Sequence, residues 1–481
     1  MKSSLLPILL LPAMCAAQQA QVEPPAASPT QTPPVMPNVT AVPAPSQINL
    51  PAGPANDADR PLTADEAAKL ALRVQPTLRL AQAQLLASRG RLQIVKAGLL
   101  PTLGLSATYG RQIVVDQGVF SFPASSTNSS TTSGTTTTSS SASTQTGTYA
   151  GLGSSVTLRQ LLFDFNHTRN LVRQADAQEK AAGHGLTLAQ LNLVYAVKQA
   201  YYTYVLDQAL VAVQEANVTN TQAELDLATA QLKAGLGAPA NVVTATSAVG
   251  SAQEALNLSR QTALIARINL AIAIGVDPRT PITASTSEEP APPSTDVNAL
   301  VGQALKQRPD ILQLIESLHA AGYELSAART ANAPSLNLSV QGSTRGSDQP
   351  FGSSTGSVGL SVSWNLFDAG AAAGSVKVAQ ADIQTAQSQL DTVTQTAISD
   401  VASAFVNLKS AEQQVLIADA TVKNALEGVR LAQGRFKAGV AIFIEVTTAQ
   451  TTLVQAQSSL VSAQTNVQQA RAQLRRAIGQ M

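Results

Sequence analysis

The sequence predicts a mixed, mostly α-helical fold that is internally duplicated, with long coiled-coil helices and four β-strands. The duplication is direct, because Leu161-Leu162-Phe163-Asp164 returns 204 residues later as Asn365-Leu366-Phe367-Asp368. Each half also carries a helical pattern of about 70 residues, a length on the order of 100 Å that no single globular core needs. Each half further contains two stretches in which apolar and small polar residues alternate, which is the period of a strand.

The first repeat is predicted at 62–275. Thr63 and Glu66 have the spacing of a capping box and begin its first helix. The expected elements are a helix from Thr63 to Gly98 broken near Pro76, strands at about 102–110 and 153–163, an inserted Ser/Thr-rich loop at 111–152, a long helix at 164–235 and a return helix from Pro239 to Ile274. Because the spacing between the repeats changes only across the loop, the scaffold on both sides of it is duplicated.

A Pro-rich linker at 276–295 leads to the second repeat at 296–481. The expected elements are a helix from Val297 to Ala331 broken at Pro309, strands at about 335–342 and 356–367, a long helix at 369–437 and a final helix that ends at Ile478. In each half, the helix before the strands and the helix after the long one together match the long helix in length. We therefore expect them to stack end to end beside it, as pairs of coiled-coil helices.

The N-terminus is typical of an exported protein. Residues 1–17 combine a lysine, an apolar stretch and small residues, as a cleaved signal peptide does, and 18–61 form a Pro/Ala-rich leader expected to be extended. Cleavage after Ala17 would remove Cys15, the only cysteine. The alternative, a lipid-modified Cys15, stays open, although the preceding residues depart from the usual motif. No later segment has 18 uninterrupted apolar residues.

Composition and motifs argue against an enzyme and against a nucleic-acid-binding protein. The formal net charge is +1 at pH 7, which gives no basic surface for nucleic acid. The three histidines lack metal-site spacing and there is no Walker-type phosphate loop, so we expect no catalytic, metal or cofactor site. The run from Gly352 to Gly356 fits the nucleophile-elbow pattern. It lies between two strands rather than before a helix, so we interpret the match as chance.

The four strands have the length and alternation of strands that cross an outer membrane. Four strands cannot close a barrel, and an open edge is not tolerated in lipid, so several copies must contribute strands to one barrel. Phe163, Phe165, Trp364 and Phe367 stand at strand ends, where aromatic side chains are expected at the membrane interface. The alternative is a soluble β-hairpin packed on the helices.

Three motifs carry a resemblance to a known family. The run from Trp364 to Gly370, Trp-Asn-Leu-Phe-Asp-Ala-Gly, resembles the strand-to-helix sequence of the TolC-type outer-membrane efflux proteins. Arg308-Pro309-Asp310 and Phe436-Lys437-Ala438-Gly439 resemble two further motifs of that family. Together with the duplication, the resemblance covers about 62–479.

The resemblance implies a homotrimer in the outer membrane with most of the chain in the periplasm. Twelve strands would close one transmembrane β-barrel, and the helices would form a long coiled-coil α-barrel. The implied function is a passive export duct of a tripartite efflux or type I secretion system. Its partners would be outer-membrane lipid, a periplasmic adaptor protein and an inner-membrane transporter of the RND or ABC type. The alternative is a periplasmic adaptor or a structural coiled-coil protein of the envelope.

The resemblance also assigns roles to the helix turns far from the strands. The residues expected to dock on the adaptor are Lys233, Ala234, Gly235 and Leu236, next to Gly237, and Phe436, Lys437, Ala438, Gly439 and Val440. Glu445 is expected at a pore constriction, where three copies would make an anionic ring. Asn241 and Thr448 stand where the family can have further acids, so this ring is expected to be thin. Any αα-hairpin could use glycine at its turn for φ > 0 alone, and Glu445 could be a solvated helix charge.

Overall fold

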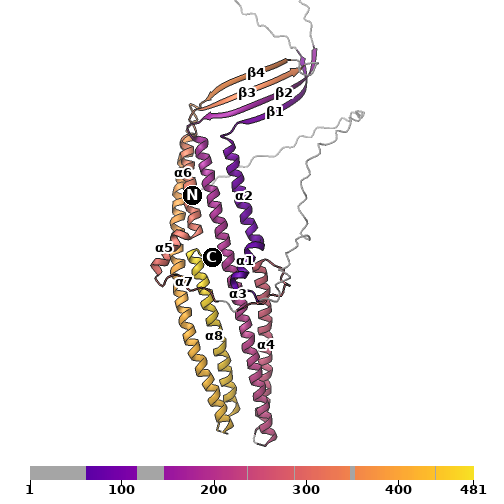
Figure 1. Cartoon of the computed structure of the whole chain (residues 1–481), viewed down its shortest axis with the longest axis vertical. Helices are drawn as coiled ribbons and strands as arrows, with labels where there is room; N and C mark the ends of the chain where they lie inside the picture. Colours follow the sequence, from indigo (N-terminus) through magenta and orange to yellow (C-terminus); the bar gives the residue numbers. More distant parts are fainter. Residues whose placement is uncertain (1–60, 116–145, 236, 286–287, 347–352, 439) are drawn as a thin grey trace, which may run out of the picture. The chain divides into compact units, whose positions relative to one another are not determined.

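The computed structural model describes residues 61–115, 146–235, 237–285, 288–346, 353–438 and 440–481. The predicted signal peptide, nearly all of the leader, Cys15 and the centre of the inserted loop lie outside these residues. The described chain is mostly helical and contains one antiparallel sheet, which confirms the predicted mostly α-helical fold class (Figure 1).

Each repeat contains two short helices, two strands, one long helix and one return helix in the same order (Figure 1). The first repeat consists of α1 (Ala64–Val74), α2 (Pro76–Ala97), β1 (Thr102–Val115), β2 (Thr146–Phe163), α3 (His167–Lys233) and α4 (Pro239–Ile274). The second consists of α5 (Val297–Gln307), α6 (Pro309–Arg329), β3 (Ser335–Gly346), β4 (Ser353–Ser363), α7 (Ala371–Lys437) and α8 (Phe443–Ile478). The long helices have 67 residues each and the return helices 36 each, so the sequence repeat is a repeat of whole elements.

Local sequence explains where the short helices begin. The backbone N–H of Thr63 donates to Glu66 Oε2 at 3.0 Å, and Thr63 Oγ1 accepts from the backbone N–H of Glu66, so the predicted capping box is formed. Pro76 and Pro309 occupy the first positions of α2 and α6. Proline is tolerated there because an N–H at the start of a helix has no intrahelical acceptor.

The helices before the strands and the return helices lie beside the long helices, as their lengths predict. α2 and α4 both pack along α3, while α6 and α8 both pack along α7. The end of α4 meets the junction of α1 and α2, where the Gln75 amide donates to the carbonyls of Ile272 and Ala273. Gly275 ends α4 with φ 89°, which L side chains rarely adopt, and a Cβ there would lie 3.0 Å from the backbone Cα of Gln75. A side chain at this position would therefore be strained and would crowd the junction of α1 and α2.

The four strands form one antiparallel sheet in the order β1-β2-β3-β4 (Figure 1). β1 and β2 extend beyond the expected 102–110 and 153–163, so 111–115 and 146–152, predicted as loop, are paired backbone. Ile113 to Val115 are strand-forming side chains that continue the ladder. β4 ends at Ser363 rather than near 367, because its partner β3 begins only at Ser335, directly after a proline.

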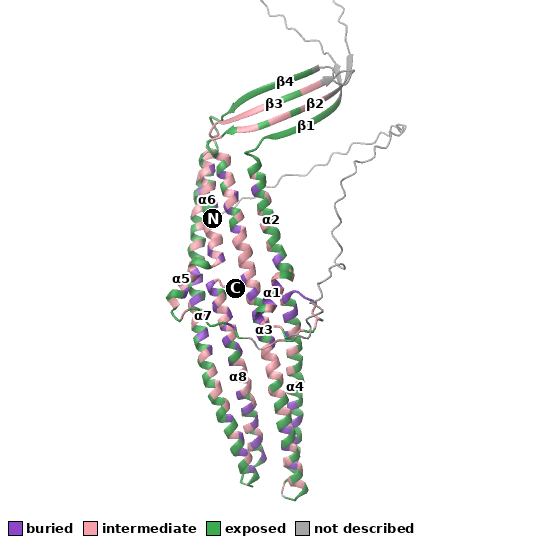
Figure 2. Cartoon of the chain, in the orientation of Figure 1, coloured by how far each residue is buried: buried purple, intermediate pink, exposed green. Residues whose placement is uncertain are grey.

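Buried residues lie along the helices (Figure 2), and small apolar side chains are the commonest among them. The first repeat has a core cluster around Tyr201, Leu270 and Ile274, and the second has one around Leu300 and Leu408. Alanine supplies many of the remaining buried positions, which lets long helices approach closely. Within the described residues, no helix combines the length and apolar character needed to cross a membrane.

Candidate functional site

One face of the sheet carries most of its apolar side chains. Residues paired across antiparallel strands share a face, so the register fixes which side chains lie together. One apolar row runs through Leu103, Leu158, Val340 and Val358. The apolar side chains of both outer strands are strongly exposed, for example Leu105 at 77 %. An exposed apolar face that spans four strands is what a sheet in contact with lipid requires.

The opposite face of the sheet is polar. The row next to the apolar one runs through Gly104, Thr157, Gln341 and Ser357. Farther along the same face, the Ser106 and Ser155 hydroxyls are 2.8 Å apart and share a hydrogen bond. A face of hydroxyl, amide and glycine positions suits contact with water.

The predicted interfacial aromatics lie at the helix end of the sheet. Phe163 ends β2 and packs edge-on against Phe165, with ring centroids 4.8 Å apart. Trp364 and Phe367 follow β4, and Phe367 is 84 % exposed. The structure therefore brings Phe163 and Phe165 together. Their location at a membrane interface stays a prediction.

The repeated Leu-Phe-Asp sequence forms the turn from strand to long helix. Phe165 and Ala369 have φ of 54° and 53°, and the residues after them, Asn166 and Gly370, also have positive φ. Asp164 Oδ2 accepts from the backbone N–H of Thr168 at 2.7 Å, and Asp368 Oδ2 accepts from that of Ala372 at the same distance. The aspartate thus satisfies a helix N–H that would otherwise lack an acceptor. The contact explains why an aspartate stands at this place in the motif that resembles the family.

The predicted docking residues form the turns between α3 and α4 and between α7 and α8. Lys233, Ala234 and Gly235 are exposed, and Gly235 has φ 72°, as expected for a tight helix end. Lys437, Ala438 and Val440 are exposed as well, while Leu236 and Gly439 lie outside the described residues.

Phe436 is the exception among these residues, because its side chain is buried. It packs edge-on against Phe443, with ring centroids 5.4 Å apart. Both belong to a cluster that also contains Ala228 and Ala245 from the first hairpin. The structure thus brings the two predicted tips together through their interiors.

The predicted constriction residues lie just inside the tips. Glu445 Oε1 accepts from Arg435 Nη1 at 2.8 Å, so the carboxylate expected to form an anionic ring already has a cationic partner. Asn241 is half-buried in the first turn of α4. Thr448 is exposed, and its hydroxyl donates to the carbonyl of Ile444 at 2.8 Å.

A buried charge cluster at Glu289, in the linker, was not predicted from the sequence. The Glu289 carboxylate accepts from Lys198 Nζ at 2.6 Å, from Arg475 at 2.9 Å and from the Tyr202 hydroxyl at 3.0 Å. Lys198 also pairs with Asp65 at 2.8 Å, and this contact lowers the pKa of Asp65. Burial raises the pKa of Tyr202, which therefore stays a neutral donor. The cluster ties the linker to both repeats.

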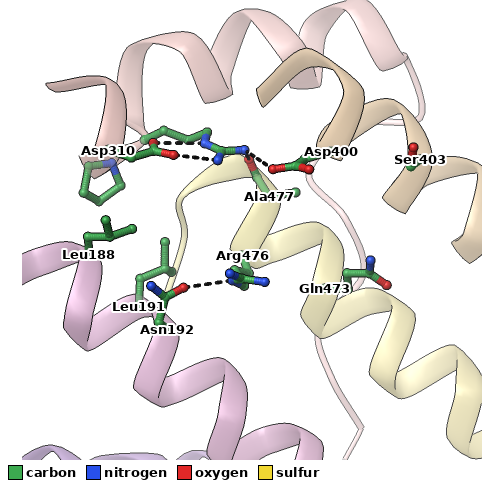
Figure 3. A pocket seen from close by; sticks show the side chains of 11 residues that line it. Leu188, Leu191, Asn192, Asp310, Asp400, Ser403, Gln473, Arg476 and Ala477 are labelled. Atoms are coloured by element: carbon green, nitrogen blue, oxygen red, sulfur yellow. Dashed lines mark hydrogen bonds and ion pairs between the residues drawn. The ribbon is translucent and has the colours of Figure 1, made fainter. Parts of the chain in front are cut away.

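A polar pocket of about 400 Å³ lies beside the junction of α5 and α6 (Figure 3). Asp310 and Asp400 both accept from the Arg308 guanidinium, at 2.6 and 3.0 Å. On the other side, Arg476 Nε donates to Asn192 Oδ1 at 3.0 Å. Each charged side chain of the pocket thus has a partner, so we interpret the pocket as a packing junction of four helices. The resemblance motif Arg308-Pro309-Asp310 builds this junction.

Comparison with known proteins identifies the family. A family profile described as outer membrane efflux protein matches residues 67–276 and 300–480. The chain belongs to the outer membrane efflux protein family. Its location in the outer membrane and its class, an export channel, are therefore those predicted from the sequence. The adaptor and structural coiled-coil alternatives do not fit this family.

Individual relatives are distant but similar over most of the chain. The outer membrane efflux protein BepC of Brucella suis is 27 % identical over 308 residues, which are 62 % of this chain and 66 % of BepC. The probable efflux pump outer membrane protein TtgC of Pseudomonas putida is 25 % identical over 389 residues, 78 % of this chain and 74 % of TtgC. The crystal structure of the outer membrane protein VceC of Vibrio cholerae has a TM-score of 0.71 at 21 % identity and covers 87 % of this chain and 96 % of VceC. This last likeness shows the fold.

Proposed function

We propose that three copies of this chain form one passive export duct, and the two open edges of the sheet carry the proposal. β1 and β4 each pair on one side only. Unpaired backbone groups are very unfavourable in lipid, while the apolar face needs lipid around it. Pairing β4 of one copy with β1 of the next satisfies both demands. Three sheets of this kind make the twelve-stranded barrel that the family resemblance implies.

The helices offer matching edges for the same assembly. α2 and α4 lie on one side of α3, and α7 forms the opposite edge of the helical layer (Figure 2). Both edges expose large apolar side chains to solvent in a single copy. They include Leu80, Leu86 and Ile94 on α2, Leu258 on α4, and Val378, Val406, Leu416 and Ile417 on α7. Burial between copies would remove this apolar surface from water.

The tips are the proposed contact with a periplasmic adaptor protein. The supporting observation is exposed apolar surface at the second turn, where Val440 and Ile442 are both 70 % exposed. Lys233 and Lys437 add a positive charge beside each turn. An inner-membrane transporter of the RND or ABC type would supply the energy, and the duct itself would perform no chemistry. The name of TtgC, an efflux pump protein, favours efflux over polypeptide secretion.

The constriction is proposed where α4 and α8 begin, at Asn241, Glu445 and Thr448. Asn241 and Glu445 occupy equivalent positions of the two repeats, so three copies would place both in one ring around the axis. In this proposal the Arg435–Glu445 pair neutralises the acid of the ring within each copy.

Electron microscopy of protein extracted in mild detergent tests the assembly. We expect a hollow particle with threefold symmetry, a helical barrel on the order of 100 Å long and a detergent belt at one end. Replacement of Leu416, which lies on the exposed edge of α7, by arginine should reduce the trimer fraction. Leu416→Met, which keeps an apolar side chain of similar size at the same position, is the control. A monomeric or belt-free wild-type particle would overturn the proposal.

A further inference from the structure

The described strands contain arginine but no acidic residue. β1, β2 and β3 each carry one arginine, at Arg111, Arg159 and Arg345, and none of the four strands has Asp, Glu or Lys within its described range. Arg159 lies two residues after Thr157, so it stands on the polar face of the sheet.

Arg159 is surrounded by small side chains. The register places it in a row with Thr102, Ser339 and Gly359, all of which are much shorter. Its side chain is exposed, and no carboxylate within the described part of the chain forms an ion pair with it. The guanidinium can therefore extend away from the sheet on the polar side.

We propose that Arg159 makes the strand lumen selective for anionic solutes, an inference that rests on the proposed trimeric duct. Three copies place three guanidinium groups at one level of a barrel whose backbone lies roughly 12 Å from the axis. The Debye length is about 10 Å at 0.1 M salt, so their field reaches across the lumen.

The tips do not oppose this preference. Glu445, the acid predicted at the constriction, is paired with Arg435, while Lys233 and Lys437 are exposed beside the turns. The described strand and tip residues thus combine several cations with one neutralised carboxylate. An anionic or zwitterionic cargo is the class of solute that this distribution favours.

Single-channel recording in planar bilayers under a KCl gradient tests the inference. Wild-type trimers should pass chloride in preference to potassium at 0.1 M salt, and the preference should shrink at 1 M, where the Debye length is about 3 Å. Arg159→Gln should lower the chloride-to-potassium permeability ratio roughly two- to fourfold, as expected for three screened charges. Arg159→Lys should retain the ratio. Arg279→Gln, which removes a 90 % exposed arginine of the linker, is the matched control.

The outcomes separate the inference from the proposed function. Trimers that insert but never conduct would overturn the duct itself. Conductance that prefers cations, or a ratio that Arg159→Gln leaves unchanged, would overturn the inference and leave the duct intact. The same comparison in an Arg435→Gln, Glu445→Gln background removes the charged tip pair. In this background Arg159→Gln should still lower the chloride-to-potassium permeability ratio. If it no longer does, the selectivity comes from the tips instead.

Discussion

The two repeats have the same order of helices and strands, but they differ in where polar and aromatic side chains stabilise them. These contacts lie near the linker in the first repeat and at the tip in the second. Their helices have the same order and nearly the same lengths, and the same positive-φ turn leads into each long helix. Near the linker, the first repeat has Lys198, Tyr201 and Tyr202, where the second has Ala402, Phe405 and Val406. The polar set of the first repeat binds Glu289 and nearby linker carbonyls, among them that of Ser285.

At the tips the relation is reversed. The second repeat has the Arg435–Glu445 ion pair and the Phe436–Phe443 ring contact. The equivalent positions in the first repeat are Gln231, Asn241, Leu232 and Pro239, which offer neither. The shared frame is therefore set by small apolar residues at helix contacts. The differences lie where a repeat meets something outside itself, which is the linker in one case and the tip surface in the other.

The largest expected effect is at the Glu289 cluster. Glu289→Ala leaves Lys198 and Arg475 without their buried carboxylate, so we expect a loss of about 3 to 5 kcal/mol in the free energy of unfolding. The apparent melting temperature of detergent-solubilised protein reports it. Glu427→Ala, which breaks an exposed pair with Arg430, is the control and should cost less than about 1 kcal/mol. Equal losses in the two variants would contradict a buried clamp.

The second effect is expected at the ring contact of the second tip. Phe436→Ala removes a buried ring that packs on Phe443, at a cost of about 3 kcal/mol. Leu232→Ala at the equivalent, half-buried position of the first tip should cost less. Hydrogen exchange of the backbone amides in each hairpin measures the loss of local stability in both variants. If the first tip exchanges as slowly as the second in the wild type, the proposed difference between the tips is wrong.

The third prediction concerns Glu224, a buried carboxyl on α3 with one oxygen lacking a hydrogen-bond partner within the described residues. Burial raises its pKa, so the charged form destabilises the fold as pH rises above the ordinary range of a glutamate. Glu224→Gln should therefore raise stability at neutral pH, by about 1 kcal/mol, and change little at pH 4. Thermal unfolding at both pH values measures this difference. Glu254→Gln, on exposed α4 surface, is the control and should change stability by less than about 0.5 kcal/mol.

The sequence predicted most of the helices and strands because each element occurs twice, so its pattern could be checked against the copy in the other repeat. Pro76, Pro239 and Pro309 each stand at the start of a helix, as their chemistry predicts. The weak alternation after Gly110 did not reveal that β1 continues. Its pairing with β2 across the insertion decides the length of both strands.

The contacts of charged side chains were less predictable. Glu289 lies in a Pro-rich linker, where nothing local indicates that its side chain is buried between the repeats. Glu445 lies in the first turn of α8, and its role at a constriction stays a prediction. Its partner Arg435 is ten residues earlier, and only the turn geometry brings the two together. The sequence position of Glu445 therefore predicts where this acid lies along the chain. Whether its charge is neutralised depends on a contact that only the folded turn creates.

The smallest expected change in stability, and the sharpest test of the tip comparison, comes from Arg435→Gln. The pair is exposed, so its loss should cost less than about 1 kcal/mol. It should nevertheless free the Glu445 carboxylate to act as the anionic ring, and so shift planar-bilayer selectivity toward potassium. Lys437→Gln removes an equal charge from the same tip without removing the partner of Glu445. A shift larger in Arg435→Gln than in Lys437→Gln, and abolished by adding Glu445→Gln, would place Glu445 at the pore. Equal shifts would mean that only the net charge of the tip matters, because a carboxylate that faces away from the pore cannot distinguish the two variants.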